Sequence, residues 1–216
     1  METRSIIVAL IFLLSFTAKA QYAYEYQNTT VTTPTGVPVN ALQFKYWVYN
    51  DFTSEEQALE DYQMTHNYNC EVISSSTKYY NCHGYAWHNV EGNMEQDKLR
   101  WIDDIDYNSN PTYNVHRYYS TVHSNGKPSY REVFTNNKAN LKVSYFPRDH
   151  SAITTSNPEY LISKWAWGPL VKHAISQCPF YKNAQIKYYE SIFSFSISGP
   201  TSVCNQATYT VENLPA

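Results

Sequence analysis

A cysteine and a distant histidine are the residues of this chain best suited to nucleophilic chemistry. Cys82 follows a Ser/Thr-rich loop, and His150 opens a stretch with the composition of a β-strand. A cysteine that attacks an amide does so as a thiolate, although free cysteine has a pKa of about 8.5. A histidine brought in from elsewhere in the chain accepts the proton. The pair predicts a hydrolase that works through a thioester on Cys82, with His150 as general base.

The residues around Cys82 predict that the thiol lies in the first turn of a helix. The helix is expected over residues 82–90, with Asn81 as its cap and Gly92 placed to end it. Unpaired N–H groups at a helix start favour a negative charge. Gly84 leaves room beside the thiol for the backbone of a substrate.

A third group must orient the imidazole through its other nitrogen. The strand expected over residues 160–165 offers Ser163 at the matching place, and Asp149 is a local alternative, as is a backbone carbonyl. Lys164 is next to Ser163, but it accepts no hydrogen bond while it is charged. Ser163 is the residue we assign to this role.

Aromatic side chains and one more histidine are predicted to line the cleft. Core packing is the alternative for at least one of the tryptophans, and a structural role is the alternative for the histidine. The candidate substrate-binding residues are Trp87, Trp165, Trp167 and His173.

No metal or cofactor is expected. The chain has no C-x-x-C pair, and the spacing of His83 and His88 puts them on different faces of a helix. The four cysteines instead allow three disulfide pairings in an oxidising compartment. A disulfide from Cys82 to Cys70 or Cys178 is the alternative to a nucleophile. With Cys82 reactive, Cys70 and Cys178 are free to pair, and Cys204 is left over.

Three segments carry a resemblance to a known family. Residues 81–86, 149–153 and 163–165 resemble the CHAP and NlpC type of papain-like amidases and endopeptidases. The resemblance covers roughly residues 79–173 and departs from the usual pattern at His83 and Asp149. It implies a cysteine at a helix start, a histidine at a strand start and a polar residue on the next strand. It also implies cleavage of amide bonds, often in peptidoglycan.

The first twenty residues predict export. A charged start is followed by an apolar run over residues 6–16 and by Ala18-Lys19-Ala20, where signal peptidase would cut before Gln21. The protein is therefore expected to be secreted or at the cell surface, with no integral membrane segment after cleavage. Its net charge of −3 and 16% charged residues give no electrostatic footprint for nucleic acid.

The remaining pattern predicts an α+β, papain-like domain over residues 41–193, with N-terminal helices packed on an antiparallel sheet. Residues 21–40 are expected to be an extended leader with at most one edge strand. Helices are expected over residues 51–65, 82–90 and 94–101, followed by strands over residues 115–122, 129–134, 141–146, 150–155, 160–165, 170–174 and 185–190.

The last residues read as a separate unit. Residues 194–216 predict two strands and resemble the beginning of a truncated Ig-like or PKD-like repeat of the kind found in secreted proteins of Bacteroidetes-type bacteria. The alternative is that these strands complete the first domain.

The sequence therefore leaves two functions open. The first is a secreted cysteine hydrolase acting on a peptide, protein or peptidoglycan substrate. The second is a non-catalytic secreted or cell-surface domain that binds through an aromatic cleft, which the 21 tyrosines and 16% aromatic residues make plausible. A Cys82 disulfide would exclude the hydrolase.

Overall fold

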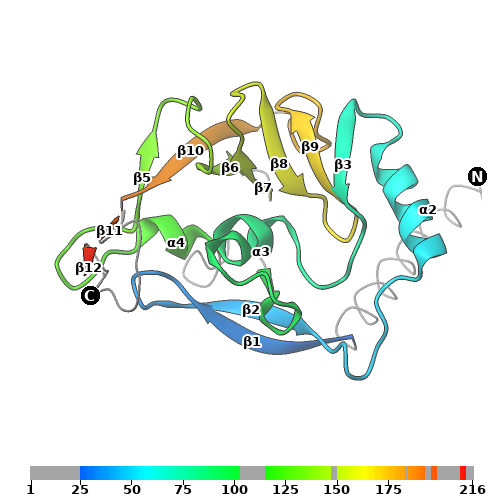
Figure 1. The fold of residues 1–216 in the computed structure, drawn as a ribbon, viewed down its shortest axis with the longest axis horizontal. Coiled ribbons are helices and arrows are strands. Elements are labelled where there is room, and N and C mark those ends of the chain that lie inside the picture. The colour runs from blue at the N-terminus through cyan, green and yellow to red at the C-terminus, as the bar shows by residue number, and fades with distance from the viewer. Residues whose placement is uncertain are drawn as a thin grey trace, which may run out of the picture.

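The computed structural model describes residues 25–102, 115–146, 150–182, 184–192, 196–198 and 210–212. Residues 1–24, residues 147–149 and Cys204 lie outside these ranges, so the signal peptide stays a prediction. Within them the chain forms helices and antiparallel sheets, so the α+β class is confirmed. A small sheet and a large sheet lie on opposite sides of one short helix (Figure 1).

The small sheet is built from the N-terminal segment. Strands β1 (Tyr26–Thr32) and β2 (Pro38–Phe44) form an antiparallel hairpin, and β4 (Trp101–Ile102) pairs with β2. The turn passes through Gly36, whose φ of 82° suits glycine. The described part of residues 21–40 is therefore a hairpin rather than an extended leader, because alternate residues such as Val31 and Val39 face the core.

The large sheet has seven antiparallel strands in the order β3-β9-β8-β7-β6-β10-β5. Six of the predicted strands, all but the one at residues 115–122, are confirmed, with each boundary shifted by at most one residue. The strands are β3 (Cys70–Ser74), β5 (Tyr130–Val133), β6 (Lys142–Phe146), β7 (Ser151–Thr154), β8 (Tyr160–Lys164), β9 (Leu170–Ala174) and β10 (Gln185–Ser191).

Helix α2 (Ser54–Thr65) confirms the first predicted helix. The Thr53 hydroxyl accepts a bond from the Glu56 N–H, and the Glu56 carboxylate accepts one from the Thr53 N–H, which completes a capping box. In Figure 1 this helix lies at the outer end of the large sheet, next to β3.

Helix α3 (Cys82–Trp87) lies between the two sheets (Figure 1). Asn81 caps it by accepting a bond from the Gly84 N–H at 2.8 Å. A 3-10 turn at Asn89–Glu91 follows, and Gly92 ends it with a φ of 94°. The start at Cys82 was predicted correctly, but the α-helix ends at Trp87 rather than at residue 90, and Gly92 ends the 3-10 turn instead.

Two other predictions were wrong. Residues 115–122 are not a strand but contain helix α4 (His116–Ser120), whose Tyr118 packs beside the Trp87 ring. Residues 94–101 hold only a 3-10 turn at Gln96–Lys98 before β4 begins. Aromatic and β-branched residues favour strands, but here packing around Trp87 decides the conformation.

The two faces of the large sheet have separate cores. The face toward α3 contributes Ile153 and Leu170 to a cluster that includes α3, α4 and the small sheet. The opposite face carries a second cluster with Tyr145, Trp165 and Cys178. Side chains alternate along each strand, so residue parity decides which core a residue joins.

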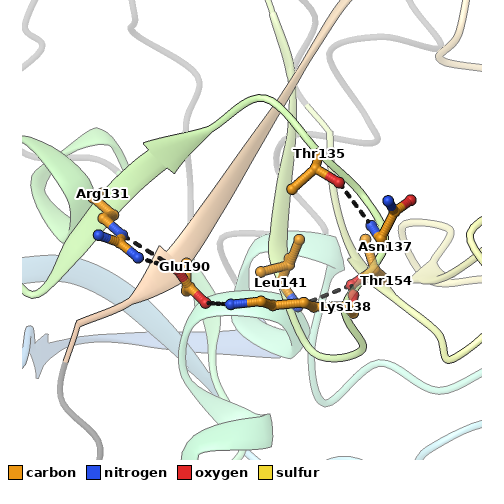
Figure 2. A network of polar contacts seen from close by, with 7 residues as sticks. All are labelled: Arg131, Thr135, Asn137, Lys138, Leu141, Thr154 and Glu190. Atoms are coloured by element: carbon orange, nitrogen blue, oxygen red, sulfur yellow. Dashed lines mark hydrogen bonds and ion pairs between the residues drawn. The ribbon is translucent and has the colours of Figure 1, made fainter.

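Polar contacts tie the far end of the large sheet together at the surface (Figure 2). Glu190 on β10 accepts two bonds from Arg131 on β5 and forms an ion pair with Lys138. Thr154 donates to the Lys138 carbonyl and accepts from the Leu141 N–H. These contacts fix β5 and the loop before β6 at the end of the sheet that lies away from the candidate site.

Strands β11 (Ser196–Ser198) and β12 (Thr210–Glu212) pair antiparallel with each other as a separate two-stranded sheet. The rest of residues 194–216 lies outside the described residues. A second domain at this end therefore stays a prediction.

Candidate functional site

The candidate site lies at one edge of the large sheet. Pairing of Ile153 with Ile162 and of Thr154 with Leu161 brings the start of β7 and the end of β8 to this edge. His150 precedes β7, and Lys164 is the last residue of β8. Helix α3 packs across β7 and β8, so the strand ends and the residues of α3 form one neighbourhood.

Cys82 is the first residue of α3 and has a free thiol. Only 6% of its surface is exposed. The Asn81 side chain anchors the start of this helix by bonding the N–H and the carbonyl of Ile102 at 3.2 and 2.7 Å. A side chain at Gly84 would place its Cβ 1.8 Å from the Arg100 carbonyl oxygen, so only glycine allows this close approach. The helix start is thus fixed against β4.

A three-way hydrogen bond joins the helix to the strand beside it. The Ser151 hydroxyl bonds His83 Nδ1 at 2.8 Å and accepts from Trp87 Nε1 at 3.0 Å. His83 directly follows Cys82, and Ser151 directly follows His150. The bond therefore holds together the two short segments that contain the predicted nucleophile and base.

The His150 imidazole points to the opposite face of the sheet from Ser151. It stacks on Phe180 with ring centroids 4.2 Å apart and meets Tyr145 edge-on at 4.9 Å. It is 1% exposed, and neither ring nitrogen has a hydrogen-bond partner among the residues that the structure describes. The Cys82 thiol is thus not hydrogen-bonded to it. Burial, together with His173 and His83, holds the pKa of His150 well below its usual range.

Ser163 belongs to a different histidine. Its hydroxyl bonds His173 Nε2 at 2.8 Å and accepts from Trp165 Nε1 at 2.9 Å. His173 Nδ1 donates to the Ala174 carbonyl at 2.9 Å, and burial lowers the pKa of His173 to about 4. The ring is therefore neutral at pH 7 with its proton on Nδ1, and Nε2 accepts from Ser163. The structure does not bring Ser163 to His150.

Lys164 is fully buried at the same edge. Its ammonium donates to the carbonyls of Thr77, Ala166 and Gly168 and lies 5.2 Å from the centre of the Tyr80 ring. Burial lowers the pKa of Lys164 to about 7, while nearby negative groups act in the other direction. Lys164 therefore acts as a hydrogen-bond donor and not as an acceptor.

The predicted aromatic wall is mostly core. Trp87, Trp165 and His173 are fully buried, so none of them presents a surface to a substrate in this structure. Trp167 is 36% exposed, and its ring lies 5.9 Å from that of Trp101. Trp101 on β4 was not singled out in the sequence, because its contact with Trp167 depends on how the small sheet packs.

Within the described residues, no group of three or more His, Cys, Asp or Glu side chains is arranged to hold a metal ion. His88 bonds the Lys98 carbonyl at 3.2 Å, away from Ser151 and His83. In the same part of the chain, no helix has the length and apolar character needed to cross a membrane.

Comparison of the chain with protein-family models, with curated proteins and with solved structures found no significant match.

Proposed function

We propose that this protein is a secreted cysteine hydrolase of papain-like type that cleaves peptide or amide bonds. Cys82 is the nucleophile and His150 the general base. The observation that carries the proposal is the His83–Ser151 hydrogen bond, which joins the residue after Cys82 to the residue after His150. Helix α3 on an antiparallel sheet, with the thiol at the helix start and the histidine before the adjacent strand, supports the same assignment.

The chemistry follows from these groups. The imidazole takes the thiol proton, sulfur attacks the amide carbon, and the amine leaves with a proton from the imidazolium. Water then hydrolyses the thioester. The proposal requires the His150 ring, now stacked on Phe180, to turn toward the sulfur when a substrate is engaged. A buried imidazole whose nitrogens have no partner among the described residues supports such a change, because it loses no hydrogen bond to them on leaving its place.

The first experiment measures alkylation of each cysteine by iodoacetamide between pH 5 and pH 10, read by peptide mass spectrometry. Cys178 is the internal control, because it is 4% exposed, much as Cys82 is, and burial raises its pKa to about 12. We expect selective modification of Cys82 near pH 6 that is lost in His150→Ala. Equal resistance of the two cysteines would instead favour a binding domain.

The second experiment measures hydrolysis. Peptidoglycan fragments and a mixed peptide pool are incubated with the protein, and new amino termini are detected by mass spectrometry. Cleavage should disappear in Cys82→Ala and persist in Cys178→Ala. Cleavage that survives in Cys82→Ala would refute the proposed nucleophile.

A further inference from the structure

Lys164 combines complete burial with the bonding pattern of a charged group. Its Nζ atom has three carbonyl acceptors, at 3.2 Å on Thr77, at 3.0 Å on Ala166 and at a short distance on Gly168. An ammonium has three N–H donors, whereas a neutral amine has two. The Tyr80 ring face adds a fourth favourable contact for a cation. The surroundings are therefore built for the charged form.

The charge has no ion-pair partner among the residues that the structure describes. The acidic groups that act on Lys164 are Asp51, Glu60 and Asp61. Asp51 accepts bonds from the Thr77 hydroxyl and the Lys78 N–H, and Asp61 accepts two bonds from Ser76. These carboxylates hold the loop before Cys82 rather than the ammonium. A buried charge without a counter-ion is strongly unfavourable.

Cys82 is placed to supply the missing negative charge. The loop from Thr77 to Tyr80 contacts the ammonium through the Thr77 carbonyl and the Tyr80 ring, and Cys82 follows this loop two residues after Tyr80. Helix α3 packs on β8, whose last residue is Lys164. A negative charge on Cys82 would raise the pKa of Lys164, as the carboxylates do.

We propose that Lys164 is the counter-ion of the Cys82 thiolate and a positioning residue of the hydrolase. The inference depends on the proposed function for its meaning in catalysis. The thiol proton still goes to His150, and the ammonium keeps its own protons while it stabilises the charge on sulfur. Lys164 touches no substrate and acts only through Cys82. The stabilisation is mutual. The ammonium stabilises the thiolate, and the thiolate supplies the negative charge that the buried ammonium lacks.

The test compares Lys164→Met with Lys172→Met in the full chain. Lys172 is a matched control, because its Nζ atom also lies 5.2 Å from the centre of a tyrosine ring but is partly exposed and paired with Glu71. The rate of Cys82 alkylation by iodoacetamide is measured against pH. We expect Lys164→Met to move the midpoint of this profile up by about one pH unit, which is a roughly tenfold loss of rate at pH values well below the midpoint. The rate above pH 10 should stay the same.

A structural role alone would change the limiting rate or the melting temperature without moving the midpoint. An unchanged midpoint in folded Lys164→Met would overturn the inference.

A second measurement needs no variant and covers the case in which Lys164→Met does not fold. Anionic iodoacetate and neutral iodoacetamide are compared at pH 6.5 on the unmodified protein. A cation beside the sulfur favours the anionic reagent, so the rate ratio at Cys82 should exceed that at Cys70 by about threefold or more. Equal ratios at Cys82 and Cys70 would also overturn the inference.

The outcomes separate this inference from the proposed function. If Cys82 cleaves amides while Lys164→Met keeps the same midpoint, the counter-ion role fails and the hydrolase stands. If the midpoint moves but no amide is cleaved, the counter-ion role stands and the hydrolase fails.

Discussion

His150 and His173 lie on the same face of the seven-stranded sheet, yet their side chains differ in hydrogen bonding. His173 has a partner at each nitrogen, Ser163 at one and the Ala174 carbonyl at the other. His150 has none among the described residues and contacts the rings of Phe180 and Tyr145 instead. Both are buried, and burial lowers the pKa of both.

The contrast separates a structural histidine from a candidate for chemistry. A phenylalanine could keep the ring contacts of His150 with Phe180 and Tyr145 and would give up no hydrogen bond to a described residue. Buried polar groups without partners are rare and need an explanation. For His150 the proposed function offers an explanation: the ring turns toward Cys82 and accepts the proton of its thiol. For His173 the hydrogen bonds already explain why the residue is a histidine.

Exchanging each histidine for phenylalanine should break the comparison most clearly. His150→Phe should lower Cys82 alkylation at pH 6.5 and any amide hydrolysis by about a hundredfold or more, because general-base catalysis is lost. Its free energy of unfolding in urea should change by less than about 1 kcal/mol, since no hydrogen bond to a described residue is removed.

His173→Phe should show the reverse pattern. It leaves the Ser163 hydroxyl without its acceptor, so the free energy of unfolding should fall by about 1 to 3 kcal/mol while Cys82 alkylation is retained. The comparison fails if His150→Phe proves the more destabilising of the two changes.

The pH dependence of stability should sharpen the comparison. A neutral buried imidazole binds a proton less readily than in the unfolded chain, where its pKa is near 6.5. The unfolded state therefore binds more protons below pH 6.5, and stability falls as the pH drops from 6.5 toward 4, the range given by His173. Each such histidine contributes a slope of about 1.4 kcal/mol per pH unit.

Urea unfolding at pH 7, 6 and 5 measures that slope. His150→Phe and His173→Phe should each remove one histidine's contribution to the slope. Of the two, His173→Phe is the variant that loses hydrogen bonds to described residues. His88 and His116, whose pKa burial also lowers, contribute equally in all three proteins and cancel in the difference. A slope unchanged in His150→Phe would show that this ring is protonated in the folded protein.

The smallest expected effect concerns Ser163, which the sequence had assigned to His150. Ser163→Ala should lower the free energy of unfolding by about 1 kcal/mol, because Trp165 Nε1 and His173 Nε2 lose their partner. Cys82 alkylation should stay unchanged, with Ser144→Ala on β6 as the control. A loss of alkylation in Ser163→Ala alone would restore Ser163 to the site.

The features predicted correctly from sequence are those with a local cause. The Asn81 cap and Gly92 each act within a few residues, so they mark where a helical segment begins and ends. The strands from residue 129 onward show the expected composition and turns. Helix α4 was missed because its conformation is set by packing against Trp87, which is distant in sequence.

The candidate site divides in the same way. Cys82 and His150 were predicted from their types and local context, and the structure brings the residues next to them, His83 and Ser151, into contact. The partner of Ser163 could not be predicted, because it depends on which face of β8 the hydroxyl occupies and on the pairing of β8 with β9. Lys164 was overlooked as a buried cation, since lysines are rarely buried and only the fold shows where this one lies.

Helix α3, held between a sheet made early in the chain and a sheet made mostly late, has a consequence for how the protein is synthesised. The hairpin over residues 26–44 and the helix emerge from the ribosome well before β6 to β10. Until those strands arrive, one side of the helix stays uncovered, and its thiol is open to oxidation. The long sequence separation of the contacts also predicts slow folding. Refolding yield should therefore improve with reductant during the first stage and not after the large sheet has formed.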